Sequence, residues 1–358
     1  MNPIQAARAA GQQIWLDNLS RALINSGELA RFIELGVAGV TTNPAIFHKA
    51  IAEGQDYRPA LAAMDASLGA EARYEGLVIE DVQRACDVIR PVFEASRGDA
   101  GYVSLEVSPA LADDEAGTVA AARRLRAAVA RDNLLVKIPA TAAGVGAIET
   151  LTGEGVSINV TLMFSLAHVE AVAGAYQRGL EKLAAAGGDI ARVRSVASVF
   201  LSRWDSLIDK QLDEIGTPEA LALRGKAGVA LARQAYQRYL ARFHGAGFAA
   251  LAAKGGRPQS MLWASTGTKN AAYPDLMYVE PLIGPETVNT LPDATLAAFI
   301  DHGRVSGNTV AQDADAASAH LAALAGLGLD LDVLGERLQQ DGLAQFATAF
   351  GKLLELTA

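Results

Sequence analysis

The chain has 358 residues, a formal net charge of −9 and one cysteine, Cys86. The acidic balance argues against general binding to nucleic acid or to an anionic membrane surface. A single cysteine excludes an internal disulfide and fits a reducing compartment. Residues 1–13 lack the apolar core of a secretory signal, and no window approaches the roughly 18 uninterrupted apolar residues of a membrane span. The sequence therefore predicts a cytoplasmic protein.

Short apolar runs recur along the chain and are candidate strands. They are residues 14–19, 37–43, 102–107, 133–139, 157–164, 195–201, 259–265 and 276–283. Most are followed by a segment with helical spacing, and this alternation implies parallel strands joined by helical crossovers. Eight such units predict a closed (β/α)8 barrel, a TIM barrel. An open doubly wound sheet is the alternative, which is weakened because no G-x-G-x-x-G turn follows the first run.

The whole chain, residues 1–358, is predicted to form a single barrel domain. Its strands are expected over roughly 14–284. The unit between the seventh and eighth strands is expected to be degenerate, because residues 266–275 are too few for a full helix. Only helices are expected after residue 284, at about 293–302, 309–326 and 331–356. Residues 285–358 are thus predicted to form a helical C-terminal region that packs on the barrel.

Polar residues interrupt or follow the apolar runs at the same relative place. They are Asp17, Asn43, Glu106, Lys137, Asn159, Thr161, Ser198 and Ser265. Functional groups of a (β/α)8 barrel lie at the carboxyl ends of its strands, and unpaired buried polar groups are costly. We therefore expect these side chains to converge on one pocket.

Lys137 stands in NLLVKIP, where apolar residues cover both faces of the strand, as in a strand buried on each side. Burial disfavours the charged form of an amine, and a neutral amine can attack a carbonyl and form a Schiff base. The protonated imine then stabilises the carbanion left when the adjacent C–C bond breaks. This chemistry needs no cofactor, and the histidines show no metal-ligand spacing. The alternative is a structural lysine that reaches solvent or pairs with Glu106 or Asp17.

Asp17 and Glu106 are candidate proton carriers. One carboxylate would deliver water for imine formation, and the other would take a hydroxyl proton to trigger cleavage. Each could instead be a salt-bridge partner. Amides and hydroxyls are suited to holding sugar hydroxyls, and the candidates are Asn43, Asn159, Thr161 and Ser198. For Asn43 a structural interpretation stays open, because Thr-Asn-Pro forms turns without any ligand.

Two segments with hydroxyl groups, a glycine and basic residues could hold a phosphate group. They are FLSRWD at 200–205 and STGTKN at 265–270, with Arg203 and Lys269 as the cations. Arg203 could equally pair with Asp205 or Asp209.

Taken together, these motifs resemble the transaldolases, in particular the longer bacterial form, whose sequences carry LWASTGTKN and LIGPETVNT. The matching segments run in family order from residue 14 to about 292: WLDNLSR, GVTTNPAIF, VSLEV, LLVKIPAT, INVTLMFS, ASVFLSRWD and LWASTGTKN. The resemblance implies a class I aldolase-type barrel that transfers a dihydroxyacetone unit in the pentose phosphate pathway. The donor would be sedoheptulose 7-phosphate or fructose 6-phosphate, and the acceptor glyceraldehyde 3-phosphate or erythrose 4-phosphate. These sugar phosphates are the expected partners, and a homo-oligomer is left open.

The resemblance also implies roles for the residues. Lys137 matches the Schiff-base lysine, Asp17 the acid/base for the C4 hydroxyl, and Glu106 a carboxylate that works through a water shared with Thr161. Groups that match substrate contacts are Asn43, Asn159 and Ser198 for the dihydroxyacetone part, and Ser265 and Arg203 for the phosphate. Many relatives have an arginine where this chain has Gly267, and Lys269 is the candidate for supplying that charge.

Two other functions are compatible with the same residues. One is a Schiff-base aldolase that releases free dihydroxyacetone to water, and the other is a sugar-phosphate binding protein without catalysis on the same scaffold. The expected C-terminal helices favour the transferase over the aldolase, because the small aldolases lack them. The lysine and the carboxylates argue against a non-catalytic scaffold.

Overall fold

The fold is a closed barrel of parallel strands, seen in a computed structural model that describes residues 2–65 and 67–358. The strands are β1 (Gln12–Leu16), β2 (Gly39–Val40), β3 (Tyr102–Glu106), β4 (Leu134–Pro139), β5 (Ile158–Met163), β6 (Ser195–Phe200), β7 (Ser260–Ala264) and β8 (Thr287–Leu291). They follow one another in chain order, and β8 closes the barrel by pairing with β1. The predicted (β/α)8 class is therefore confirmed, and the first seven predicted strands coincide with β1 to β7.

The prediction of the eighth strand at 276–283 was wrong. That segment forms turns and a short 3-10 helix, Glu280–Leu282, in which Pro281 cannot donate a ladder hydrogen bond. Its apolar residues are buried as a packed connection rather than as a strand. The true strand, β8, lies within 285–358, where only helices were expected. This strand does not read as an apolar run because it contains a buried polar residue, Asn289. The Asn289 side chain donates to the Tyr278 carbonyl oxygen at 2.9 Å, and this hydrogen bond compensates for its burial.

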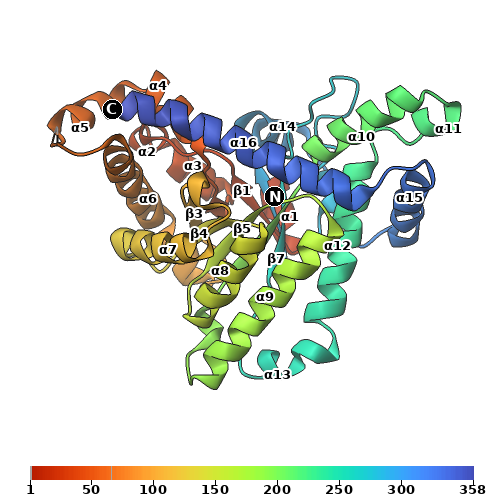
Figure 1. The fold of residues 1–358 in the computed structure, drawn as a ribbon, viewed down its shortest axis with the longest axis horizontal. Helices are drawn as coiled ribbons and strands as arrows, with labels where there is room; N and C mark the ends of the chain where they lie inside the picture. The colour runs from red at the N-terminus through yellow and green to blue at the C-terminus, as the bar shows by residue number, and fades with distance from the viewer. Residues whose placement is uncertain (1, 66) are drawn as a thin grey trace.

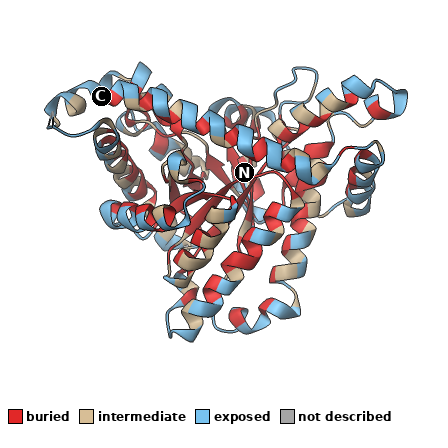
Figure 2. Cartoon of the chain, in the orientation of Figure 1, coloured by how far each residue is buried: buried red, intermediate tan, exposed pale blue. Residues whose placement is uncertain are grey.

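Helices surround the barrel, and most of them bury one face, as Figure 2 shows by their red inner and blue outer sides. They are α1 (Pro3–Ala9), α2 (Arg21–Asn25), α3 (Glu28–Leu35), α4 (Pro44–Glu53), α5 (Arg58–Ala63), α6 (Ala70–Ala95), α7 (Glu115–Val129), α8 (Ala142–Gly153), α9 (Leu166–Ala185), α10 (Ser202–Ile215), α11 (Pro218–Leu221), α12 (Ala227–Phe243), α13 (Ala249–Ala252), α14 (Asp293–His302), α15 (Ala314–Gly326) and α16 (Leu331–Thr357). Polar caps begin several of them. Ser165, for example, accepts a hydrogen bond from the His168 amide and so satisfies a free N–H at the start of α9.

The last helix, α16, crosses one end of the barrel and reaches α4 and α6, as the blue ribbon in Figure 1 shows. Gln339 ties it to the barrel, because its amide donates to the carbonyl oxygens of Ala140 and Leu162, each at 3.0 Å. Both carbonyls lie at the carboxyl-end side of the barrel, after β4 and within β5. The C-terminal region is therefore placed over the barrel end at which the predicted site residues lie.

Within the described ranges, no single helix is long and apolar enough to cross a membrane. The bent pair α15 and α16 passes the same test of length and composition. Several apolar side chains of α16, among them Leu338, Phe346 and Leu353, are buried against the rest of the chain.

Candidate active site

A cavity of about 180 Å³ opens at the carboxyl end of the barrel. Its walls are Asp17, Thr41, Asn43, Lys137, Asn159, Thr161, Ser198, Phe200, Arg203, Leu262, Ala264, Ser265, Gly267, Lys269, Thr290, Pro292 and Phe346. Every site residue predicted from the sequence is among them except Glu106, which lies beside the cavity in contact with Lys137. The strand ends therefore converge as expected.

Lys137 lies on β4 between two functional neighbours. Strand register sets it directly opposite Glu106 of β3 and Asn159 of β5. Its side chain is only 6% exposed, and Nζ donates to the Thr42 carbonyl oxygen at 2.9 Å and lies 3.4 Å from Glu106 Oε2. The ion pair considered from the sequence is thus present, and the amine also faces the cavity.

Glu106 is surrounded by apolar groups on the side away from Lys137. Phe47, Tyr74 and Phe350 line the small pocket in which it lies. Burial raises the pKa of the Glu106 carboxyl to about 7, against the opposing effect of the Lys137 charge and its hydrogen bonding. This carboxyl can therefore gain or lose a proton near neutral pH.

Asp17 follows β1 and also faces Lys137. Burial raises the pKa of its carboxyl above the ordinary value, while the Lys137 charge and a hydrogen bond from Thr41 oppose the shift. The Thr41 hydroxyl donates to Asp17 Oδ1 at 2.7 Å and lies 2.6 Å from the Thr290 hydroxyl. Because the Thr41 hydroxyl donates its proton to Asp17, the Thr290 hydroxyl must be the donor to Thr41. This chain of hydrogen bonds holds the Asp17 carboxylate in one orientation.

Asn159 is held in one orientation by its neighbours. Ser198 donates to Asn159 Oδ1 at 2.8 Å, and Asn159 Nδ2 donates to the Ser104 hydroxyl at 3.0 Å. Two other buried oxygens near the amine lack full hydrogen bonding: Thr161 Oγ1 has no partner among the described residues, and Glu106 Oε2 has only the 3.4 Å ion pair with Lys137. Because such groups are costly to leave unpaired, they mark the place where a water or a substrate hydroxyl would bind.

Asn43 serves as the N-cap of α4. Its Oδ1 accepts a hydrogen bond from the Ile46 amide at 3.0 Å. Asn43 therefore has a local structural role, as a helix cap rather than as a residue of the expected turn. The same residue also lines the cavity, so the cap holds the side chain at the edge of the site.

Arg203, at the start of α10, makes no ion pair with any described carboxylate. The two proposed partners are engaged elsewhere: Asp205 accepts from the Tyr278 hydroxyl at 2.7 Å, and Asp209 accepts from the Tyr273 hydroxyl at 2.7 Å. The alternative pairing of Arg203 was therefore wrong. Burial lowers the pKa of the guanidinium from its ordinary value, and an unpaired buried cation of this kind suits an anionic ligand.

Ser265 lies close to Arg203 along the cavity wall. It has a φ of +54°, and its hydroxyl lies 2.8 Å from that of Ser202. Gly267 and Lys269 continue the same wall. The two segments expected to hold a phosphate therefore meet in space.

Several wall residues were not predicted. Thr41 and Thr290 follow the strand-end rule, so their positions in the sequence could have identified them. Phe346 could not have been found in this way because it comes from α16. Its ring lies over the Lys137 amine, with 5.8 Å between Nζ and the ring centroid. Among the described residues, no group of three or more His, Cys, Asp or Glu is arranged to hold a metal ion.

A buried lysine flanked by two carboxyl groups at the carboxyl end of a closed parallel barrel defines the class of (β/α)8 proteins with a lysine-centred site. Residues 14–357 match the family model of transaldolase/fructose-6-phosphate aldolase. The chain belongs to this family.

Curated relatives cover nearly the full chain. It is 55% identical over 356 residues to a transaldolase of Thiobacillus denitrificans and 51% identical over 355 residues to one of Neisseria gonorrhoeae, with 99% of each chain covered in both cases. A transaldolase of Thermobifida fusca is 46% identical over 359 residues, covering all of this chain and 98% of the relative.

Proposed function

We propose that the chain is a transaldolase that transfers a dihydroxyacetone unit in the pentose phosphate pathway. The donor is a ketose phosphate, sedoheptulose 7-phosphate or fructose 6-phosphate, and the acceptor is glyceraldehyde 3-phosphate or erythrose 4-phosphate. The observation that carries this proposal is the position of the Lys137 amine, buried beside Glu106 and facing a cavity with an unpaired guanidinium at its wall. The full-length similarity to curated transaldolases supports it.

The first step is imine formation on Lys137. In the active form, the Lys137 amine and the Glu106 carboxyl share one proton. When that proton is on Glu106, the neutral amine attacks the ketone. The carbinolamine then loses its hydroxyl as water. Thr161 Oγ1, which has no partner among the described residues, and Glu106 Oε2, which has only the ion pair with Lys137, support a bridging water that carries this proton.

The second step is cleavage. Asp17 takes the proton from the C4 hydroxyl, the C3–C4 bond breaks, and its electron pair moves into the protonated imine to form an enamine on Lys137. The aldose phosphate leaves. Attack of the enamine on the acceptor aldehyde reverses these events, with Asp17 returning the proton to the new hydroxyl. We assign the hydroxyls of the bound three-carbon unit to Asn43, Asn159 and Ser198.

The phosphate group of the substrate is assigned to the other end of the cavity. Arg203 supplies a cation without a competing carboxylate, and the hydroxyl of Ser265 adds a hydrogen bond. Lys269 supplies the positive charge that many relatives have as an arginine at the position of Gly267.

The experiment that tests this function is an acceptor-dependence assay with fructose 6-phosphate. A transaldolase consumes it only when erythrose 4-phosphate is present. A Schiff-base aldolase would consume it equally well without acceptor and would release dihydroxyacetone, and that result would contradict the proposed transfer.

Glu106→Gln should lower kcat/KM by about 10²–10⁴-fold, since it removes a positioned proton carrier. In the wild type, kcat/KM should rise with pH through about 7, where the Glu106 carboxyl titrates. Below that pH the Glu106 carboxyl is already protonated and cannot accept the proton that the attacking amine must lose. The pH profile of Glu106→Gln should lack this inflection, and an unchanged inflection would assign it to another group. Glu71→Gln, an exposed site on α6, is the control.

Phe346→Ala should raise the ratio of dihydroxyacetone release to transfer several-fold. The ring covers the Lys137 amine, so its removal admits water to the enamine. The substitution should also cost about 3 kcal/mol of stability. Leu353→Ala, a buried site on the same helix that does not line the cavity, is the control for stability alone. Equal release ratios in the two variants would show that α16 does not exclude water.

We propose further that the barrel and the C-terminal helices act as one domain, since α16 contributes Phe346 to the cavity wall. A cytoplasmic location is proposed from the phosphorylated substrates and from the free, buried thiol of Cys86.

A further inference from the structure

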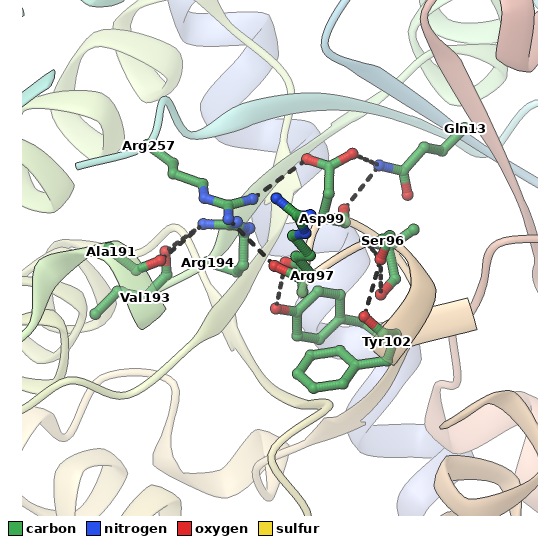
Figure 3. Close-up of polar contacts among 12 residues, drawn as sticks. Gln13, Ser96, Arg97, Asp99, Tyr102, Ala191, Val193, Arg194 and Arg257 are labelled. Carbon is green, nitrogen blue, oxygen red and sulfur yellow. Dashed lines mark hydrogen bonds and ion pairs between the residues drawn. The ribbon is translucent and has the colours of Figure 1, made fainter. Parts of the chain in front are cut away.

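Two cavities, each of about 510 Å³, lie at the amino end of the barrel, opposite Lys137. Tyr102 and Arg194 line both of them. Figure 3 shows this region: Arg194 comes from the segment before β6, Arg97 from the segment after α6, and Arg257 from the segment before β7. None of these residues belongs to the site described above.

Arg194 is buried without a counter-charge. It is 8% exposed, and its Nη1 donates only to two nearby backbone carbonyl oxygens, those of Ala191 at 3.4 Å and Val193 at 3.1 Å. Its Nε is buried and has no acceptor among the described residues, and no described carboxylate pairs with it. Burying a charge in this way is costly unless a partner compensates it. The guanidinium therefore lacks the acceptors that its position requires.

The neighbouring charges add to this excess. Arg97 and Arg194 line the first cavity, and Arg194 and Arg257 line the second together with Asp99, the carboxylate drawn in Figure 3. That carboxylate is already shared, because Arg257 Nη1 lies 3.6 Å from it and Arg8 Nη2 lies 3.4 Å from it. Arg97 makes no ion pair with any described residue, and its carbonyl oxygen accepts from Arg257 Nη2 at 3.2 Å.

Four carboxylates also lie in the wall of the first cavity: Glu94, Asp132, Glu154 and Asp189. Glu94 lies 3.6 Å from Arg90 and Glu154 lies 2.5 Å from Arg123, and none of the four forms an ion pair with Arg194. An anion entering from solvent past the exposed Arg97 would therefore meet guanidinium groups with free donors. This arrangement occurs in a chain whose net charge is −9, so it does not follow from an overall basic composition.

We propose that Arg97, Arg194 and Arg257 form a second anion site, here called the amino-end site, that binds a phosphate dianion. Guanidinium groups offer paired N–H donors that match phosphate oxygens. The cavities are in the size range of sites for small metabolites, so the phosphate can be free or carried as a monoester. The amino-end site lies at the opposite end of the barrel from Arg203 and is independent of the proposed catalysis.

Titration calorimetry with inorganic phosphate tests the site in the full chain. Arg203→Gln removes the guanidinium at the carboxyl end and so isolates the amino-end site. This variant should still bind one phosphate per chain, and Arg194→Gln added to it should weaken that binding at least tenfold. Sodium chloride at matched ionic strength controls for screening. Loss of all phosphate binding in Arg203→Gln alone would overturn the proposal, and so would binding that survives Arg194→Gln unchanged.

Because Arg194 is buried, its replacement can unfold the chain, and thermal unfolding of each variant is the check. If Arg194→Gln does not fold, the double variant Arg97→Gln/Arg257→Gln in the Arg203→Gln background decides, since Arg97 is exposed and Arg257 half-buried. It should also weaken phosphate binding at least tenfold, and unchanged affinity would overturn the proposal. Arg31→Gln, an exposed site on α3, is the matched control and should bind like its parent.

Competition experiments identify the source of the phosphate. Glycerol phosphate and adenosine monophosphate carry the same dianion but no reactive carbonyl. A monoester that displaces inorganic phosphate and binds more tightly supports an ester ligand, whereas tighter binding of inorganic phosphate supports the free ion. Failure of all three to bind the Arg203→Gln variant would refute the site without bearing on transaldolase activity, which is measured separately.

Discussion

Lys137→Met should lower the turnover of fructose 6-phosphate with erythrose 4-phosphate by at least about 10⁴-fold. Methionine keeps most of the volume of the lysine side chain but offers no amine, so neither the imine nor the enamine can form. The change also removes the charge that faces Glu106 at 3.4 Å. The measurement is kcat in a coupled assay, together with thermal unfolding to show that the variant is folded.

Borohydride reduction adds a direct readout for the same residue. Wild-type chain treated with fructose 6-phosphate and borohydride should carry a stable adduct on Lys137, identified by peptide mass. Lys352→Met, an exposed position on α16, should show the wild-type rate and the same adduct. An adduct on another lysine, or substantial turnover by Lys137→Met, would refute the assigned role.

Asp17→Asn should lower kcat by about 10²–10⁴-fold, because it removes the acceptor of the C4 hydroxyl proton. Asparagine has nearly the same shape, and its oxygen can still accept the hydrogen bond that Thr41 donates at 2.7 Å. The geometry of the site should therefore survive while the proton transfer does not. The measurement is kcat under donor saturation.

Trapping separates the role of Asp17 from that of Lys137. Imine formation precedes cleavage, so Asp17→Asn should still give the borohydride adduct with the intact donor. Asp332→Asn is the matched control, since this exposed carboxylate on α16 does not line the cavity. It should change the rate little. If Asp17→Asn formed no adduct, Asp17 would act in imine formation instead.

Much of the site could be predicted because a barrel repeats one geometric rule. Each apolar run marks a strand, and the polar residue at its carboxyl end faces the same mouth. Lys137, Asn159 and Ser198 were found in this way, and strand register brings them together. The rule failed for the last apolar run, 276–283, which forms a packed connection instead of a strand. It also missed β8, in which Thr287 and Asn289 donate to carbonyl oxygens of the preceding connection.

The predictions that failed concern contacts between distant segments. Asp205 and Asp209 are close to Arg203 in sequence, yet tyrosines of the long connection after β7 engage them instead. Phe346 reaches Lys137 only because α16 folds back across the barrel end. No local pattern in α16 distinguishes this phenylalanine from the others that the helix buries.

The sequence by itself determined the alternation of strands and helices, the strand-end positions of the polar residues and an amine within an apolar strand. These follow from local periodicity, because side-chain direction along a strand repeats every two residues. Only the tertiary structure decided the environment of each charge: the apolar pocket that raises the pKa of Glu106 to about 7, the free guanidinium of Arg203, and the buried Arg194 at the far end. The free energy of a charge depends on the groups that replace its water, and in this chain those groups come from remote segments.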